Sequence, residues 1–292
     1  MANTRDIRRR IKSVKNTAQI TRAMQLVAAS KMKRAQESAL AGRPYAVLMA
    51  EILSKLGGRV SDIKHPFLEE REVKSRGILV VSTDKGLCGA LNSNVFRRIV
   101  EIEGDIRFVA IGRKASQFLS RTRRELLAEF TISDRVLFSE VRLPVEFLIN
   151  AYLEGSVDTV ELLYPRYVNP LVQDPILCPL IPIENLNSII DKLGHQIVEA
   201  PLGHDDREIH FEPEAEAILG ELLPLFIKQE VYQTVLEAKA SEHSARMVAM
   251  KSATDNANNL VDDLTLQYNK ARQAAITQEI LEISAATSAA SN

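Results

Sequence analysis

The sequence contains no tryptophan, and aromatic residues make up only 5% of its 292 residues. A large aromatic-lined pocket, or a surface that stacks nucleic acid bases, is therefore disfavoured. The two cysteines lie 90 residues apart, which gives no disulfide framework or zinc pair and favours reduced thiols in a cytosol-like compartment. The longest run without a charged side chain, 86–96, has 11 residues, too few to span a membrane. We expect a soluble chain whose role at any membrane is peripheral.

The formal net charge of −1 hides two oppositely charged ends. Residues 1–34 hold ten lysines and arginines against one acidic residue, Asp6. Residues 201–292 hold fifteen acidic residues against seven basic ones. The two ends are therefore complementary in charge, and the chain length predicts about two domains.

The first 56 residues have the repeat of a coiled-coil helix. Steps of four and three residues from Ile7 reach fifteen positions, of which twelve are apolar. This period predicts a narrow seam, rich in alanine, that packs closely against one other helix. Pro44 is expected to kink the helix or to start a new segment, and Gly57-Gly58 to end it. A continuous helix of about 50 residues would extend ~75 Å, longer than a small domain is wide.

Helical character returns over 214–284, where Pro224 and Gly220 are the only residues of their types. An apolar stripe with a mean step of 3.75 residues predicts a helix that supercoils little, or in the opposite sense to the first seam. Such a helix is unstable alone, so we expect it to form an antiparallel pair with the N-terminal helix. The stripe consists of Ala245, Ala249, Ala253, Ala257, Leu260, Leu264, Tyr268, Ala271 and Ala275.

Between the two helices, short apolar runs alternate with helical segments, which predicts a central α/β domain of Rossmann-like type. Gly77–Thr83 is typical of a buried strand, and a helix is expected after Leu91. Prolines in the last strand of this domain place it at a sheet edge. Further strands are expected over 107–111, 159–164, 176–183 and 208–211, and helices over 113–120 and 141–153.

The predicted fold is therefore a mixed α and β fold, a long antiparallel coiled coil with a central α/β domain. Its predicted parts are an N-terminal long helix over 1–57, a connector over 58–76, the α/β domain over 77–207, and a C-terminal long helix over 208–292 that packs on 1–57.

The loop Thr83–Asn92 follows a strand and precedes a helix, where phosphate-binding loops usually lie. It has neither the Walker A nor the dinucleotide-binding glycine spacing, which favours a tight turn or a contact surface over a nucleotide site. The five histidines never lie four residues apart and none is near a cysteine, so no metal site is expected. No nucleophile elbow is present either. We expect no catalytic centre, no cofactor and no metal ion.

Three interpretations of the basic N-terminal residues remain open. They can form a solvated face that pairs with the acidic C-terminal helix, bind nucleic acid phosphates, or meet an acidic protein surface. An arginine-rich, acid-poor start is also typical of a mitochondrial transit peptide, but here the pattern continues into the seam without a break.

The last ten residues, 283–292, contain no charged side chain. A frayed tail is the ordinary interpretation of such an end. A tail without charges also fits a narrow opening in another protein, because no unpaired charge would be buried there. Arg272, Gln273, Thr277 and Gln278 provide hydrogen-bonding groups just before it.

Four segments resemble the gamma subunit of rotary F-type ATP synthases, and they occur in the order of that family. The start of the chain matches bacterial members, which disfavours a removed transit peptide, and the redox-switch insertion of chloroplast members is absent. The segments are 20–32 (ITRAMQLVAASKM), 82–92 (STDKGLCGALN), 244–256 (SARMVAMKSATDN) and 268–279 (YNKARQAAITQE).

The resemblance implies a non-catalytic rotor shaft inside a ring of three alpha and three beta subunits. Ion flow through the c-ring turns the shaft, whose asymmetry favours a different conformation of each beta subunit and so drives ATP synthesis. Reverse rotation with ATP hydrolysis pumps ions. The epsilon subunit and the c-ring are implied to hold the α/β domain, at the cytoplasmic face of the bacterial plasma membrane.

The resemblance also implies two groups of contact residues. One group is expected to meet the catch loops and the acidic lever of the beta subunit, and the other to meet epsilon and the c-ring. The first group consists of Arg272, Gln273 and Thr277 near the tip, Met24 and Arg246 where the helices meet the lever, and the basic residues Arg8, Arg9, Arg10, Lys31, Lys33 and Arg34; the second consists of Asp84, Lys85, Gly86, Leu87 and Cys88.

Two other classes of protein remain as alternatives. A nucleic-acid-binding coiled coil would show salt-dependent affinity for RNA or DNA. A nucleotide-dependent enzyme would need a specific phosphate loop, for which the sequence supplies only Gly86 and Gly89. A vacuolar or archaeal rotary shaft is not expected to carry an α/β domain between its helices, so residues 77–200 count against it.

Overall fold

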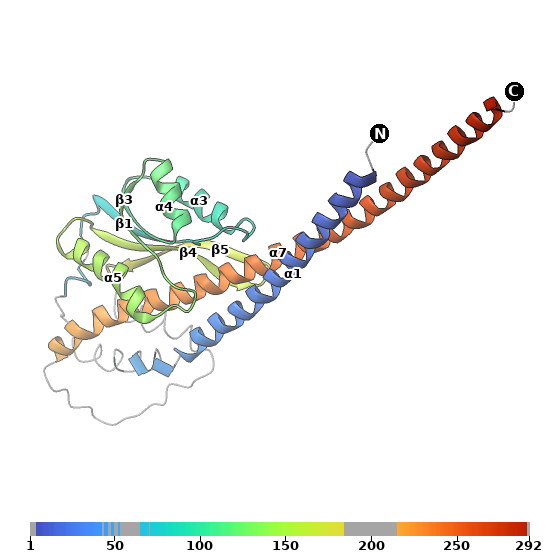
Figure 1. Cartoon of the computed structure of the whole chain (residues 1–292). Coiled ribbons are helices and arrows are strands. Elements are labelled where there is room, and N and C mark those ends of the chain that lie inside the picture. Colours follow the sequence, from blue (N-terminus) through green and yellow to red (C-terminus); the bar gives the residue numbers. More distant parts are fainter. Residues whose placement is uncertain are drawn as a thin grey trace. The chain divides into compact units, whose positions relative to one another are not determined.

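The computed structural model describes residues 4–42, 44–45, 48–49, 52, 65–69, 71–183 and 215–290. The chain divides into two compact units, unit 1 with Met1–Ala28 and Arg246–Asn292, and unit 2 with Ala29–Ala245. Helices α1 (Thr4–Ala41) and α7 (Ala215–Ala290) each contribute to both units (Figure 1). Long terminal helices with a central α/β sheet confirm the predicted fold class. The bounds of the four predicted parts stay predictions.

Unit 1 is an antiparallel pair of helices (Figure 1). The predicted seam of α1 is confirmed, because its positions from Ile7 to Ala28 are all buried or half-buried. Helix α1 ends at Ala41, close to the break expected at Pro44, and Gly57-Gly58 lies outside the described residues.

The predicted stripe of α7 needs correction. Leu260, which belongs to it, is 47% exposed, and Ala275 is exposed as well. The buried positions follow steps of four and three residues, the same period as the seam of α1. The expected step of 3.75 is therefore wrong, and with it the reason for expecting weak or opposite supercoiling. The buried positions are Met250, Thr254, Ala257, Val261 and Leu264.

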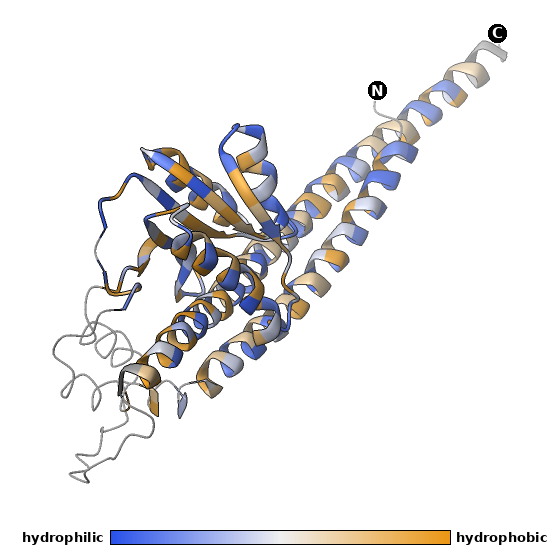
Figure 2. Cartoon of the chain, turned by 90° about the vertical axis from the view of Figure 1, so that its left-hand side faces the viewer, coloured by the Kyte–Doolittle hydropathy of each residue, from blue (hydrophilic) through white to orange (hydrophobic). Residues whose placement is uncertain are grey.

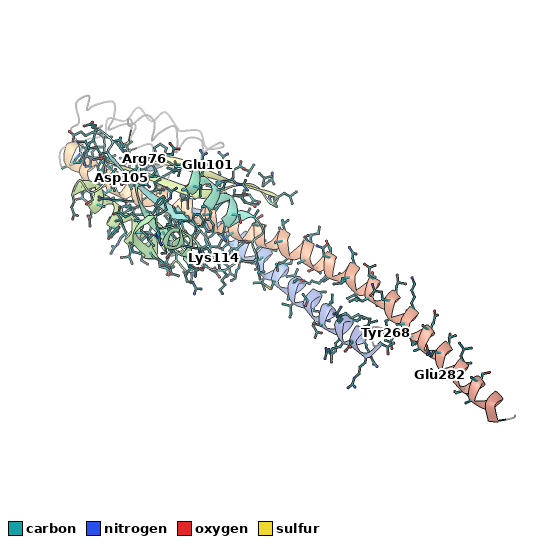
Figure 3. All side chains as sticks on the ribbon, turned by 90° about the horizontal axis from the view of Figure 1, so that it is seen from above. Arg76, Glu101, Asp105, Lys114, Tyr268 and Glu282 are labelled. Atoms are coloured by element: carbon teal, nitrogen blue, oxygen red, sulfur yellow. The ribbon has the colours of Figure 1, made fainter. Side chains whose placement is uncertain are left out.

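Beyond the seam, α7 continues as a single exposed helix. Every described side chain from Arg272 to Ala286 is exposed. Figure 3 shows Tyr268 beside the start of α1 and Glu282 on the part of α7 that extends past it. Unit 1 therefore ends in one helix that no other described element of the unit covers.

Unit 2 contains a five-stranded sheet in the order β3-β2-β1-β4-β5. The first four strands pair in parallel, and β5 pairs antiparallel with β4 at the edge, as its prolines predicted. The four predicted strands before residue 184 are confirmed, β3 was not predicted, and 208–211 lies outside the described residues. The strands are β1 (Ser75–Val81), β2 (Asp105–Ile111), β3 (Glu125–Phe130), β4 (Thr159–Asn169) and β5 (Val172–Ile181).

Helices cover both faces of this sheet. Helices α3 (Leu91–Glu101) and α4 (Arg113–Arg121) pack on one face, against Ile78 and Phe108 among others. Helix α5 (Phe138–Leu153) and the first part of α7 pack on the other. All three shorter helices confirm predicted ones. The central strands β1 and β2 are therefore buried on both faces over most of their length. The exposed end of α7 mixes hydrophilic and hydrophobic residues (Figure 2).

Candidate functional site

The segment 82–92, called the loop 82–92 below, runs from the end of β1 into the first two residues of α3, and hydrogen bonds among its own residues close it. The Thr83 hydroxyl donates to the carbonyl oxygen of Lys85 at 2.7 Å and accepts from the Asn92 amide at 2.8 Å. Leu87 has a φ of 64°, and 61% of the residue is exposed. Because a non-glycine residue in this region costs on the order of 1–3 kcal/mol, the rest of the loop must hold Leu87 in place. The loop thus presents an apolar side chain to its surroundings.

The five residues expected to contact epsilon and the c-ring differ in accessibility. Lys85, Gly86 and Leu87 are exposed, whereas Cys88 is only 2% exposed. The thiol of Cys88 lies 3.3 Å from the Asn92 amide nitrogen, and its side chain packs with Leu91 and Ala245. The half-buried Asp84 accepts a hydrogen bond from the backbone N–H of Arg113 at 3.1 Å. Residues 85–87 are therefore accessible to a partner protein, whereas Asp84 and Cys88 hold the loop in place.

The residues expected near the tip lie together on the exposed part of α7. Arg272, Gln273 and Thr277 all have exposed side chains. The Thr277 hydroxyl donates to the carbonyl oxygen of Gln273 at 2.9 Å, one turn earlier on the same helix. The guanidinium of Arg272 and the amide of Gln273 are thus held at the surface of unit 1.

The basic residues of α1 fall into different environments. Arg8, Arg9 and Arg10 are exposed in unit 1, and Arg9 makes a 4.0 Å ion pair with Asp6 of its own helix rather than with α7. Met24 and Arg246 are half-buried in the same unit.

Lys33 and Arg34 are exposed, but they belong to unit 2, where Lys33 lies 3.8 Å from Glu37. The predicted basic residues of α1 are therefore divided between the two units.

Sequence reasoning missed a group of charged residues in unit 2. Asp134, between β3 and α5, lies close to Lys31 of α1 and to Lys239 and His243 of α7. Lys239 in turn pairs with Glu242. No sequence motif marks Asp134, because its neighbours come from segments more than 100 residues away on either side.

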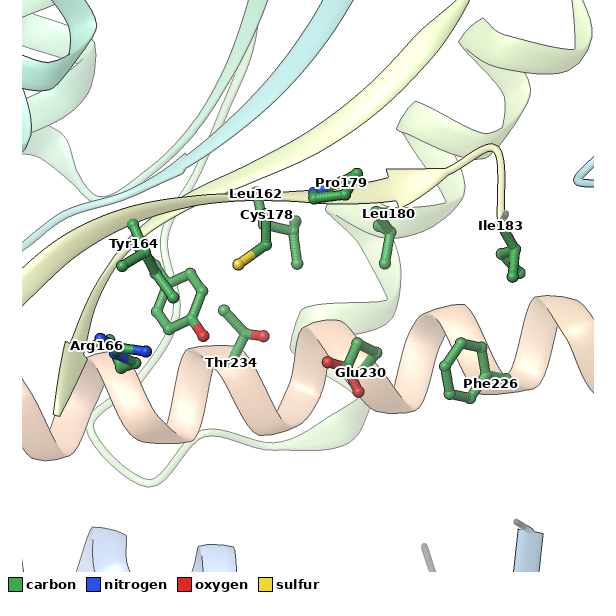
Figure 4. A pocket seen from close by; sticks show the side chains of 11 residues that line it. Leu162, Tyr164, Arg166, Cys178, Pro179, Leu180, Ile183, Phe226, Glu230 and Thr234 are labelled. Carbon is green, nitrogen blue, oxygen red and sulfur yellow. The ribbon is translucent and has the colours of Figure 1, made fainter. Parts of the chain in front are cut away.

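A cavity of about 330 Å³ lies between β4, β5 and α7 (Figure 4). Alternate residues of β4 and several residues of β5 line it, together with Phe226, Glu230 and Thr234, which follow each other at one-turn spacing on α7. Burial, and then the charge of Glu237, raises the pKa of the Tyr164 phenol, so this group stays protonated. In the described part of the chain, no group of three or more histidine, cysteine or acidic side chains could hold a metal ion. The cavity thus offers an apolar space with a few polar groups.

None of the described helices is both long enough and apolar enough to cross a bilayer.

Comparison with known proteins gives one family. The family model described as ATP synthase matches residues 3–290. The ATP synthase gamma chain of Opitutus terrae is 57% identical over 294 residues, which covers 100% of both chains. That of Methylacidiphilum infernorum is 47% identical over 98% of both.

Solved structures give the same fold. The rotor of the Euglena gracilis mitochondrial ATP synthase is similar with a TM-score of 0.65 at 18% identity, over 94% of this chain and 98% of that one. The central stalk of the Tetrahymena thermophila mitochondrial enzyme is similar with a TM-score of 0.56 at 26% identity, over 80% of this chain and 99% of that one.

Proposed function

The chain belongs to the ATP synthase gamma chain family, and we propose on that premise that it is the central rotor shaft of an F-type ATP synthase. It couples ion flow through a c-ring to ATP synthesis and hydrolysis in the beta subunits, and it is not itself a catalyst. The observation that carries this conclusion is the 57% identity to a gamma chain over the full length of both proteins.

The structure of unit 1 fits the mechanics of a shaft. A shaft can drive catalysis only if each orientation stabilises a different conformation of each beta subunit, because a ligand shifts an equilibrium only by its differential affinity. One exposed helix beyond a two-helix seam gives an asymmetric surface of this kind. The seam supplies stiffness, since melting of either helix would expose its buried residues.

The proposed partners are three alpha and three beta subunits, epsilon, and the c-ring; nucleic acid is not among them. A solved structure at 26% identity is described as a central stalk with its c-ring, which supports a place between a catalytic ring and a membrane sector. The chain is then attached peripherally, at the cytoplasmic face of the bacterial plasma membrane.

The proposed contacts with beta follow the exposed residues of both helices. Exposure of the tip side chains supports their role at the catch loops, and the half-buried Met24 and Arg246 are proposed for the acidic lever. The remaining contacts are electrostatic, between the lever and the basic residues of α1. Apart from Lys31, which pairs with Asp134 of the same chain, the proposed set is Arg272, Gln273, Thr277, Met24, Arg246, Arg8, Arg9, Arg10, Lys33 and Arg34.

Affinity purification of the chain from mildly solubilised membranes tests the function. We expect three copies each of two larger nucleotide-binding chains per copy of this one, with ATP hydrolysis in the eluate and none from this chain alone. Recovery only from the soluble fraction, alone or with RNA, would contradict the proposal and favour the basic helix as a nucleic acid binder.

The loop 84–88 is proposed to contribute to the contact with epsilon and the c-ring. Exposure of Lys85 and Leu87 supports such a contact, and cysteine substitutions there allow it to be tested by cross-linking. In the purified complex, Lys85→Cys and Leu87→Cys should form adducts with epsilon or c subunits. Arg97→Cys, on the exposed side of α3, is the control. Adducts with alpha or beta subunits alone would contradict this assignment.

A further inference from the structure

The carboxylate of Asp134 stands between the two long helices within unit 2. Its Oδ2 accepts a hydrogen bond from Nζ of Lys31 on α1 at 2.5 Å. Its Oδ1 lies 4.0 Å from Nε2 of His243 on α7. One side chain from the segment between β3 and α5 therefore reaches both helices.

The electrostatic surroundings keep this carboxylate ionised. Burial raises the pKa of Asp134, but the hydrogen bond and charge of Lys31, together with the charges of Lys239 and His243, outweigh it. The pKa of Asp134 consequently lies below its usual value. Lys239 is itself buried and lies 3.2 Å from Glu242, so its own charge is compensated within α7.

Helix α7 is enclosed on all sides at this level. All eight residues from Ala238 to Ala245 are buried, whereas a helix that packs on one surface buries only one face. The Ser244 hydroxyl donates to the carbonyl oxygen of Pro170 in the β4–β5 turn at 3.0 Å, and Ala245 packs against Cys88 and Leu91. The β4–β5 turn and the loop 82–92 therefore enclose α7 together with the Asp134 segment.

We propose that Asp134 is a positioning residue that locks α1 and α7 to the sheet of unit 2, so that a torque on this unit turns both helices together. Apolar packing is not directional, whereas a charge-assisted hydrogen bond resists displacement in a defined direction. The inference rests on the proposed function, because only a rotor carries torque.

The test compares ion pumping with ATP hydrolysis in membrane vesicles that hold the complete complex. The variants are Asp134→Ala and Asp134→Asn, with Asp105→Asn as a matched control on an exposed aspartate at the start of β2. ATP hydrolysis is measured with an uncoupler, which dissipates the ion gradient and so removes the load on the rotor. Ion pumping is measured while the gradient builds up.

All variants should hydrolyse ATP at the wild-type rate without load. Against a gradient, Asp134→Ala should pump at least about threefold fewer ions per ATP, because packing alone restrains α1 and α7 less than packing together with the charge-assisted bond does. Asp134→Asn should be intermediate, since its amide oxygen still accepts from Lys31. The side chains of Lys31 and Asp134 are 40% and 50% exposed, so the double variant Lys31→Met/Asp134→Leu should keep the thermal stability of the complex close to that of wild type, because an exposed ion pair contributes little to stability. It should still pump fewer ions per ATP under load, which a merely structural role would not produce.

Equal pumping per ATP under load in Asp134→Ala and Asp105→Asn would overturn the inference and leave the proposed function intact. If the complex with Asp134→Ala does not assemble, Asp134→Asn, which keeps the size of the side chain, is tested instead. The number of ions pumped per ATP under load is then compared between Asp134→Asn and Asp105→Asn. A wild-type chain that supports no pumping in these vesicles would instead contradict the proposed function.

Discussion

Thr21 and Thr254 place their hydroxyl oxygens 2.7 Å apart inside the seam of unit 1, where both residues are buried. Each hydroxyl also lies near a carbonyl oxygen of its own helix, Ala18 at 3.1 Å and Met250 at 2.8 Å. Two hydroxyl protons cannot serve three contacts, so one threonine donates to the other and the second donates to its own helix. This polar contact fixes the register of the two helices at one level of an otherwise apolar seam.

Removal of one threonine should cost more than removal of both. Thr21→Val is expected to lower the free energy of unfolding by about 1 kcal/mol, and Thr254→Val by a similar amount, because each leaves a buried hydroxyl with fewer partners. The double variant should be close to wild type, since it leaves no polar group unsatisfied. Urea unfolding followed by circular dichroism measures the coupling in a double-mutant cycle. Strictly additive losses would show that the two hydroxyls do not interact.

The seam of α1 could be predicted from the sequence because the burial of a helix pair follows a fixed period. The same logic failed on α7, where apolarity alone selected Leu260 and passed over Thr254. The partner helix decides which positions are buried, and it accepts a threonine where another threonine faces it. A single sequence shows the type of each residue but not the partner of its hydroxyl.

Strand β3 was missed for a related reason. Its sequence, ELLAEF, consists mainly of residues that favour helices, so no local signal predicts a strand. The exposed edge of β2 provides the backbone partners, and tertiary pairing overrides the local preference. Asp134 was missed because its contacts with Lys31 and His243 exist only after the chain has folded. The tip residues, in contrast, were expected from the family resemblance rather than from spacing, and the structure places them on one exposed helix.

The tip of α7 should be required for coupling but not for folding. The double variant Arg272→Ala/Gln273→Ala removes two exposed side chains. The helicity of the isolated chain should therefore be unchanged, and its free energy of unfolding should stay within about 0.5 kcal/mol of wild type. In the complex, ATP synthesis or assembly should weaken. Asn258→Ala/Asn259→Ala, also exposed on α7, is the matched control. Wild-type synthesis by the tip variant would rule out the assignment to the catch loops.

A proline at Ala249 should break the pair of helices. Ala249 lies in the interior of α7, where proline removes a backbone hydrogen bond and costs ~3 kcal/mol or more. Circular dichroism of Ala249→Pro should show a loss of helix, and the complex should not assemble. Ala249→Ser changes the side chain but keeps the backbone donor, and it serves as the control. Unchanged helicity with full assembly would mean that α7 is not continuous here.

Asp158 should make the stability of the chain depend on acid pH. Its Oδ2 accepts the backbone N–H groups of Ser75 and Lys74, each at 2.8 Å, and these bonds lower the pKa of the carboxyl group. A group whose pKa is lower in the folded state stabilises the fold above its unfolded value of about 4, and this contribution is lost as the pH falls through the folded pKa.

The variant Asp158→Asn cannot titrate, so the urea midpoint should fall less between about pH 5 and pH 2 than in wild type. Asp105→Asn is the control, because Asp105 is exposed at the start of β2. Identical pH profiles for wild type and Asp158→Asn would show that the two backbone bonds do not persist in solution.

Substitution by alanine should destabilise the chain at Gly112 but not at Gly86. Gly112 follows β2 with a φ of 96°, and a Cβ atom there would lie 2.3 Å from the backbone oxygen of Ser82. Its N–H donates to the carbonyl oxygen of Phe130 at 3.0 Å, so it cannot move away from the sheet without losing that bond. Gly112→Ala therefore combines backbone strain of on the order of 1–3 kcal/mol with a clash against backbone.

Gly86, in the loop after β1, has open space around the position of a Cβ atom. Gly86→Ala should stay within about 0.5 kcal/mol of wild type, because nothing must move to accommodate the methyl group. The free energies of unfolding of both variants, measured in urea, compare a glycine with a positive φ and a close backbone neighbour with a glycine that has open space around it. Comparable losses in the two variants would mean that Gly86 also needs a backbone conformation that only glycine adopts easily. A stable Gly112→Ala would mean that the ends of β1 and β2 lie farther apart than described. The 2.8 Å hydrogen bond from the Ser82 N–H to the Ile111 carbonyl oxygen does not allow such a separation.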